Sequence, residues 1–193
     1  MPVRSRVAPR PHLIGIDDGP FRKHRDRETP LVAVVMEGCD LVEGVAIRSF
    51  PVDGDDVTGF LAAWIGGLRF RPVLRAVVLG GVTIAGLAVV DLPRLARETG
   101  LGAIAVGRRD PRDHGVADAL RAAGLADRIP ALERAPAAEP AGPGLWAACA
   151  GIAPERARAL LAASRRKSAL PEPLRLAHLI AAAVARGSSR GRA

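Results

Sequence analysis

The sequence predicts a single α/β domain, in which a mixed sheet begins with an antiparallel meander and carries helices on both faces. The chain has 193 residues, 49% of them hydrophobic, which is enough for one core and too short for two comfortable ones. Near the N-terminus, three apolar runs follow one another with short connections. Further along, apolar runs alternate with segments of helical spacing, which is the pattern of a sheet covered by helices.

Three strands are expected first, at residues 12–16, 31–36 and 41–50. The turn sequence Asp17-Asp18-Gly19-Pro20 ends the first strand, and a basic, polar loop follows as far as Pro30. The second strand is a continuous apolar run with three valines, which suits a buried strand. Short turns between consecutive strands predict the meander.

Helices and strands alternate over the next stretch of the chain. Apolar residues recur at helical spacing over 57–70, with Asp55 as the expected N-cap. The β-branched run 73–79 predicts a buried strand, which Gly80-Gly81 ends. A helix at 91–99 and a strand at 103–106 continue the alternation.

The last third of the chain is predicted to be mainly helical. A helix is expected at 113–123, with Asp113 as its N-cap and Gly124 just beyond its end. Residues 135–144 are rich in Pro, Ala and Gly and predict a loop. Two further helices, at 154–164 and 174–186, are entered through prolines, which the first helical turn tolerates.

The domain is expected to span residues 12–186, between a basic N-terminal arm at 1–11 and a basic tail at 187–193. No apolar run reaches 18 residues and no signal peptide is recognisable, so the sequence predicts a cytoplasmic protein without a membrane segment. Cys39 and Cys149 lie far apart in apolar surroundings, which predicts free thiols rather than a zinc site. No obligate protein partner is implied.

Charge is distributed unevenly along the chain. The formal net charge is +8. Residues 1–30 carry a net charge of +3, residues 155–193 carry +7, and the stretch between them carries −2. This asymmetry is typical of a phosphate-binding surface, and solvated helix faces with a loose tail would explain it equally well. Because 26 of the 28 basic residues are Arg, a GC-rich genome would give the same overall composition.

Two carboxylates stand at the end of the first predicted strand. Ligands of such sheets bind at the carboxyl ends of central strands. This rule points to three possible ligand sites, which are Asp17-Asp18, Gly80-Gly81 and the loop after Val106. Carboxylates this close raise each other's pKa, and a divalent cation such as Mg²⁺ would relieve the repulsion. The alternative is a polar turn with both carboxylates in water.

A second acidic cluster comprises Asp53, Asp55 and Asp56, where a strand meets a helix. Helix capping is the favoured interpretation for Asp55 and Asp56, and Asp53 is the residue most free to reach a metal ion. On the last predicted helix, His178 shares a polar stripe with Arg175, Ala182 and Arg186. That stripe either faces solvent or supplies a strand-end cleft with a proton donor and two guanidinium groups.

Four motifs, in order, resemble those of the archaeal endonuclease-V-like family called endonuclease dU. They are Ile14-Gly15-Ile16-Asp17-Asp18-Gly19-Pro20-Phe21; Val52-Asp53-Gly54 with Asp56-Val57-Thr58; Gly81-Val82-Thr83-Ile84-Ala85-Gly86 running to Val89-Val90-Asp91; and Pro171-Glu172-Pro173-Leu174-Arg175-Leu176-Ala177-His178-Leu179-Ile180 with Arg186-Gly187-Ser188-Ser189-Arg190-Gly191-Arg192-Ala193. Together these motifs cover nearly the whole chain.

The resemblance implies a ribonuclease-H-like fold and cleavage of a phosphodiester with the help of Mg²⁺ or Mn²⁺. Its expected substrate is DNA with deaminated bases, deoxyuridine in particular, with RNA as an alternative. By position, Asp17 is the first metal ligand, Asp53 a second, and His178 lies near the scissile phosphate. Phosphate-binding residues are then expected at Arg175, Arg186, Arg190 and Lys23. The scarcity of aromatic residues argues against stacking on single strands and leaves open a pocket for an extruded base, lined by Phe21 or Phe70.

One position departs from the family pattern. Where the family usually has an Asp before the Gly of the third motif, this chain has Gly80. Loss of a carboxylate weakens a hard-cation site, and Asp18 is the candidate to compensate. The sequence therefore leaves two readings open, an active endonuclease and a nucleic-acid-binding relative without catalysis. A third reading, a protein that binds a small phosphorylated ligand, lacks any Gly-rich phosphate loop.

Overall fold

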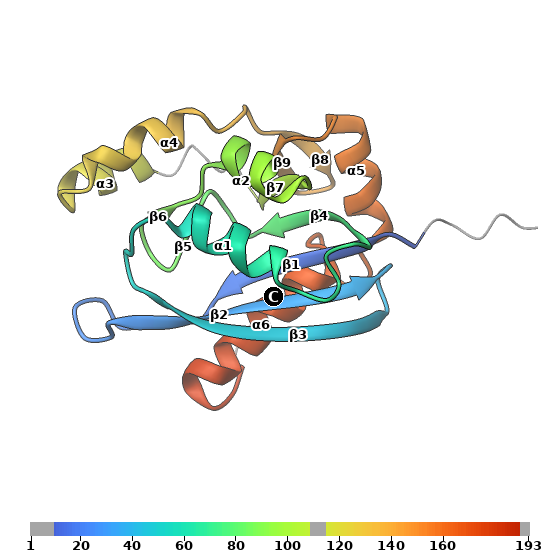
Figure 1. Ribbon diagram of the computed structural model, residues 1–193, viewed down its shortest axis with the longest axis horizontal. Helices are drawn as coiled ribbons and strands as arrows, with labels where there is room; N and C mark the ends of the chain where they lie inside the picture. Colours follow the sequence, from blue (N-terminus) through green and yellow to red (C-terminus); the bar gives the residue numbers. More distant parts are fainter. Residues whose placement is uncertain (1–9, 109–114, 190–193) are drawn as a thin grey trace, which may run out of the picture.

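The computed structural model describes residues 10–108 and 115–189 as a seven-stranded mixed sheet with helices on both faces (Figure 1). The N-terminal arm up to residue 9, the predicted cap Asp113 and the tail from Arg190 lie outside the described residues. The strands run in the order β3-β2-β1-β4-β7-β9-β8. Their bounds are β1 His12–Asp18, β2 Glu28–Glu37, β3 Leu41–Pro51, β4 Leu74–Leu79, β7 Gly102–Gly107, β8 Glu139–Gly142 and β9 Leu145–Ala150.

Parallel pairing is confined to the centre of the sheet. Strand β1 pairs antiparallel with β2 and parallel with β4, and β4 pairs parallel with β7. Strands β3, β9 and β8 add antiparallel pairs on the two sides. A separate hairpin, β5 (Thr83–Ile84) and β6 (Ala88–Val89), follows the end of β4. The carboxyl ends of β1, β4 and β7 therefore meet at one edge of the sheet.

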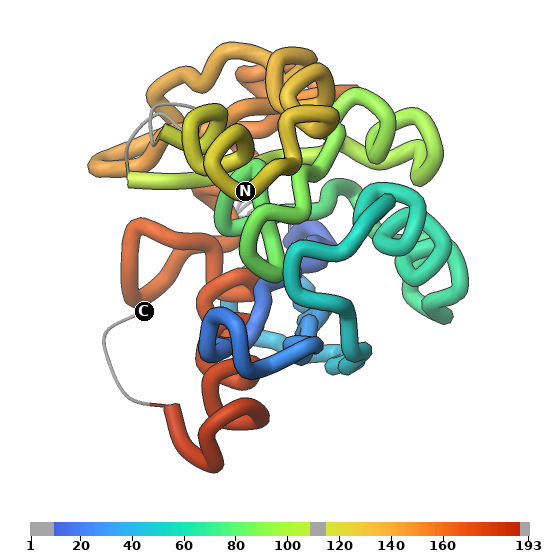
Figure 2. Tube along the Cα trace, turned by 90° about the vertical axis from the view of Figure 1, so that its left-hand side faces the viewer, coloured from blue at the N-terminus to red at the C-terminus, as the bar shows by residue number. Residues whose placement is uncertain are grey.

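Helices divide between the two faces because successive strand residues point to opposite sides. Ile14 and Ile16 of β1 belong to the core under the helices α1 to α4. Leu13, one residue earlier, packs with α5 and α6 on the other face. Figure 2 shows α1 and α6 on opposite sides of the sheet. The helices are α1 Val57–Gly66, α2 Leu92–Thr99, α3 Val116–Ala122, α4 Ile129–Glu133, α5 Pro154–Ala163 and α6 Glu172–Arg186, with a 3₁₀ turn at Ala126–Arg128.

The predicted meander, central strands and most helices are confirmed, and three local predictions were wrong. Strand β1 continues through Asp17 and Asp18, which were expected in a turn. Asp56, not Asp55, caps α1, since its carboxylate accepts from the backbone N–H of Gly59. Strand β8 lies in the stretch 135–144 that was expected to be a loop, and β9 was not anticipated. Alanine, glycine and proline, which are poor strand formers, make up six of the ten residues of these two strands.

Helix α6 approaches β1 closely because residue 15 has no side chain. A Cβ added at Gly15 would overlap the backbone of Pro173 and Leu174. Glycine is therefore required for this close approach of backbone to backbone. It places the middle of α6 directly over the carboxyl end of β1.

Within the described residues, no helix is long and apolar enough to cross a membrane. Cys39 and Cys149 are free thiols, as expected.

Candidate functional site

A pocket of about 700 Å³ opens at the carboxyl ends of β1, β4 and β7. The sequence predicted a ligand site at this edge of the sheet. Asp17, Gly80 and the residues after Val106 all line the pocket, as that prediction requires. Helix α6 forms one wall. The polar and charged side chains of the lining are Asp17, Asp18, Arg108, His178 and Arg186, and the apolar ones include Pro20, Phe21, Val106, Leu170 and Leu174.

Asp17 and His178 form the central contact of the pocket. Oδ2 of Asp17 lies 2.9 Å from Nδ1 of His178, which joins β1 to α6. The Asp17 side chain is 19% exposed and that of His178 is 51% exposed. The hydrogen bond to Asp17 raises the pKa of His178 above its ordinary value, although partial burial opposes the rise. The pair therefore combines a shielded carboxylate with an imidazole that substrate can reach.

The two neighbouring carboxylates point to opposite faces of the sheet. Asp17 faces α6, whereas Asp18 shares the face of Ile14 and Ile16 and lies near the backbone of Ala85. Burial raises the pKa of Asp18 to about 6, and the charge of Asp17 adds to the rise. Both residues reach the pocket because β1 ends there, but they do not form a side-by-side pair of ligands.

Gly80, the residue that follows β4, lies next to Asp17. The parallel register pairs Ile16 with Leu79, so Asp17 and Gly80 are the next residues along. A Cβ added at Gly80 would lie 3.3 Å from Oδ1 of Asp17. A carboxylate at position 80 would therefore stand beside that of Asp17, whereas glycine contributes no side chain there.

Asp53 is held away from the pocket lining. Its Oδ1 accepts a 2.6 Å hydrogen bond from the backbone N–H of Leu87, and its own N–H donates to the carbonyl of Ala85. These bonds fix the turn between β5 and β6. Asp53 itself has a φ of 55°, a left-handed conformation that Asp tolerates better than most residues. The structure thus gives its carboxylate a role in the turn, whereas the sequence suggested a metal ligand.

The other two acidic residues near α1 are engaged in ion pairs. Asp56 lies 2.5 Å from Arg94 and Asp55 lies 2.5 Å from Arg128. The capping interpretation is therefore confirmed for Asp56 and not for Asp55.

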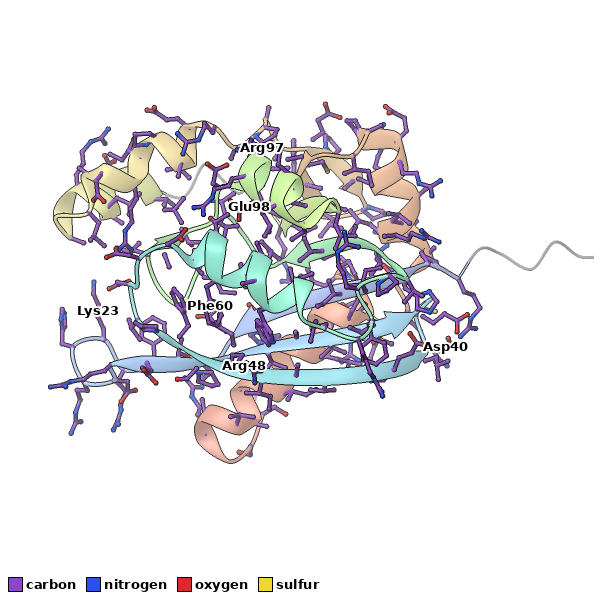
Figure 3. The ribbon with its side chains drawn as sticks, in the orientation of Figure 1. Lys23, Asp40, Arg48, Phe60, Arg97 and Glu98 are labelled. Atoms are coloured by element: carbon purple, nitrogen blue, oxygen red, sulfur yellow. The ribbon has the colours of Figure 1, made fainter. Side chains whose placement is uncertain are left out.

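The four basic residues that were expected to bind phosphate do not all lie together. Arg186 lines the pocket, but Arg175 binds Glu172 at 2.6 Å and lines a different cavity. The two arginines are eleven positions apart on the helix, or about 16 Å at 1.5 Å per residue. Lys23 projects from the loop between β1 and β2 (Figure 3). Arg190 lies outside the described residues.

Two further pocket residues come from loops. Arg108 follows β7 and is exposed at the pocket; the sequence selected this loop but no residue in it. Phe21 also lines the pocket, in agreement with one of the two aromatic candidates for a base-binding wall. The other candidate, Phe70, packs instead against Gly44 and beneath the guanidinium of Arg69.

Comparisons with known proteins agree with this architecture. A family model described as endonuclease dU matches residues 9–185. The UPF0215 protein of Methanothermobacter thermautotrophicus is 37% identical, over 94% of this chain and 91% of that one. The UPF0215 protein of Thermococcus kodakarensis is 38% identical, over 96% of this chain and 97% of that one.

Solved structures extend the likeness. A crystal structure of a protein of unknown function from Archaeoglobus fulgidus has a TM-score of 0.82, 32% identity, and coverage of 90% of this chain and 98% of that one. Endonuclease V of Streptomyces avermitilis (TM-score 0.54, 20% identity, 88% and 79% covered) shares the fold. Endonuclease V of Ciona intestinalis, solved with a 24mer DNA containing an inosine followed by a ribo-adenosine, also shares the fold. Its TM-score is 0.52 at 14% identity, with 87% of this chain and 82% of that one covered. The fold is therefore the ribonuclease-H-like fold of endonuclease V.

Proposed function

Because the chain belongs to the endonuclease dU family, we propose that it is a metal-dependent endonuclease that cuts a phosphodiester in DNA containing deaminated bases. The observation that carries the proposal is the Asp17–His178 pair in a pocket that also holds Arg108 and Arg186. This arrangement puts a carboxylate, a proton donor and two phosphate-binding groups within one pocket.

The donor groups of the pocket fit a hard divalent cation. Oδ2 of Asp17 faces His178, so Oδ1, on the side of Gly80, remains for an ion. The raised pKa of Asp18 shows that negative charge is costly here, and a cation would lower that cost. Mg²⁺ and Mn²⁺ prefer such oxygen ligands. Asp17 would hold the ion, which supplies activated water and neutralises phosphate charge when bound. Asp18, on the opposite face of the sheet, would add negative charge near the ion.

His178 would move a proton. Its Nδ1 faces Asp17, which leaves Nε2 as the ring atom for proton transfer to the leaving oxygen. Asp17 favours the protonated imidazole, as the raised pKa of His178 shows. Arg108 and Arg186 would bind phosphate oxygens, for which the planar guanidinium is well suited.

The apolar part of the pocket fits a base outside the helical stack. Phe21, Val106 and Leu174 form apolar walls of the same 700 Å³ pocket. Proteins that read a damaged base draw it out of the duplex, at least cost where pairing is already weakened. The family's description as endonuclease dU and the inosine-containing DNA bound by the Ciona enzyme both support a deaminated base as the substrate feature.

A second candidate function is nucleic-acid binding without cleavage. Gly80 favours it, because the strand next to Asp17 offers no second carboxylate. Labelled duplexes containing deoxyuridine, deoxyinosine or no lesion, incubated with Mg²⁺, Mn²⁺ or EDTA, distinguish the two. The proposal predicts metal-dependent cleavage of the lesion-bearing strands. Retained, salt-sensitive binding with no cleavage under any metal would support the second candidate and overturn the first.

A further inference from the structure

A second group of potential metal ligands lies at the other end of the sheet from the pocket. It consists of His12, Glu37 and Glu43, and one ligand atom from each lies within 4.8 Å of the others. Within the described part of the chain, this is the one set of three such residues that satisfies this distance. The three residues come from three adjacent strands, β1, β2 and β3.

Strand pairing and a β-bulge bring the three side chains together. His12 and Glu37 are opposite each other in the antiparallel register of β1 and β2, so their side chains share a face. On β3, Gly44 pairs with Val35 and Val42 pairs with Met36, which leaves Glu43 as the extra residue of a bulge. Bulges redirect a side chain, and this one turns Glu43 towards His12.

His12 and Glu43 are in close contact without forming a hydrogen bond. Nε2 of His12 lies 3.1 Å from Oε2 of Glu43, yet this oxygen is buried and has no hydrogen-bond partner. The ring N–H axis is thus not directed at the oxygen. Two ligands of one tetrahedral ion stand about 3.4 Å apart at ligand distances near 2.1 Å. A 3.1 Å contact that is not a hydrogen bond fits two atoms that share an ion.

Arg10 leaves room for such an ion. Its Nε donates to Oε1 of Glu37 at 3.2 Å, and its Nη2 donates to Asp40 at 2.7 Å. A carboxylate has two oxygens with about four acceptor sites, so Glu37 keeps capacity for a further ligand bond. All three side chains are partly buried, which limits competition from water.

We propose that His12, Glu37 and Glu43 form a binding site for a divalent transition-metal ion of the zinc class. One imidazole and two carboxylates match the ligands of Zn²⁺, whereas Mg²⁺ takes oxygen ligands alone. The site joins the start of β1, the end of β2 and the bulge of β3. Asp17 lies five residues further along β1, about 17 Å away at 3.3 Å per residue, so the two sites are separate. The bound ion would stabilise the sheet and take no part in cleavage.

The test measures zinc binding by the full-length protein, purified without metal, in the presence of excess Mg²⁺. The variants are His12→Asn and Glu43→Gln. His24→Asn is the matched control, because His24 is exposed in the β1–β2 loop and its φ of 65° suits Asn. We expect one equivalent of Zn²⁺ for the wild type and for His24→Asn, and at least a tenfold weaker affinity for the two site variants.

Three further readouts identify the site. Zinc X-ray absorption should show an imidazole and oxygen ligands without sulfur, which excludes the cysteines. An Asp17→Asn variant should keep its equivalent of zinc, which excludes the pocket. Saturating zinc should raise the melting temperature of the wild type by roughly 5 °C or more, and that of Glu43→Gln much less. The proposal is overturned if the wild type binds no zinc, if both site variants bind it normally, or if Asp17→Asn alone loses it.

Discussion

The carboxylate of Asp17 and the imidazole of His178 are 161 residues apart in sequence and lie 2.9 Å apart in the structure. Strand β1 presents Asp17 at its carboxyl end, and α6 lies close enough to present His178 because Gly15 has no side chain. The pair faces a pocket that also contains two arginines. The proposed activity depends on this contact.

Gly80→Asp should strengthen metal binding in the pocket. The new carboxylate would extend from a Cβ 3.3 Å from Oδ1 of Asp17 and add a second oxygen ligand for a hard cation. We expect Mn²⁺ affinity to rise by roughly tenfold, which corresponds to about 1.4 kcal/mol, and the metal-free protein to lose stability through like-charge repulsion. Gly81→Asp is the matched control, because a Cβ there meets only Thr83 at 3.9 Å. Equal Mn²⁺ affinity in both variants and the wild type would contradict this view of position 80.

His178→Asn should slow cleavage and alter its pH dependence. Loss of a general acid costs on the order of 100-fold in rate. The hydrogen bond to Asp17 keeps the pKa of His178 above its ordinary value, so the wild-type rate should fall as pH rises through that raised pKa. The same shift stabilises the fold below the unfolded-state pKa and is lost as pH rises through the folded-state pKa. Single-turnover rates across pH test this, and an unchanged basic limb in the variant would refute it.

Asp53→Asn distinguishes a turn residue from a metal ligand. An amide oxygen can still accept from the N–H of Leu87, and Asn tolerates the φ of 55°. We expect stability and cleavage to change little, whereas Asp53→Ala should cost about 1–2 kcal/mol of stability, because it loses the acceptor and strains the backbone. If Asp53→Asn keeps its fold but loses cleavage, Asp53 is a metal ligand, as the sequence had suggested.

Glu172→Gln should destabilise the start of α6. Burial raises the pKa of Glu172, but its bonds to Arg175 and to the N–H of Lys167 outweigh burial and hold the pKa below its ordinary value. The ion pair is well shielded, with side chains 5% and 15% exposed. We expect a loss of about 1.5–3 kcal/mol at pH 7. Because the pKa is lowered, this contribution is present above the unfolded-state pKa and is lost as pH falls through the folded-state pKa. Urea unfolding at pH 7 and pH 3 measures it, and an equal loss at both values would contradict the assignment.

Strong local patterns made much of the fold predictable. The valine-rich run of β2 and the helical spacing of α1 are visible in the sequence because burial there demands apolar residues at fixed intervals. Strands β8 and β9 were missed because their residues are mainly Ala, Gly and Pro. Hydrogen bonding between β8 and β9, and between β9 and β7, holds these strands in the sheet. Sequence periodicity does not reveal which strands pair.

The candidate site was predictable only in part. Strand ends identified Asp17 and Gly80, and the polar stripe of the last helix identified His178. The same stripe wrongly grouped Arg175 with the residues of the pocket. Helical spacing defines a face of the helix but not how far along that face a pocket extends. Arg108 was missed because a single loop arginine has no periodic signature. The opposite directions of Asp17 and Asp18 became evident only once β1 proved to continue through both residues.

The most direct test of the account is single-turnover cleavage of a deoxyuridine-containing duplex with Mn²⁺ by the wild type, Asp17→Asn and Asp40→Asn. Asp40 is the matched control, because it lies at the opposite end of the sheet in an exposed ion pair with Arg10 (Figure 3). We expect Asp17→Asn to keep the fold by circular dichroism and to lose cleavage by at least about 100-fold, because mutation of even a group that only orients a metal ligand costs about 10–100-fold, while Asp40→Asn cuts like the wild type. Wild-type cleavage by a folded Asp17→Asn variant would contradict it.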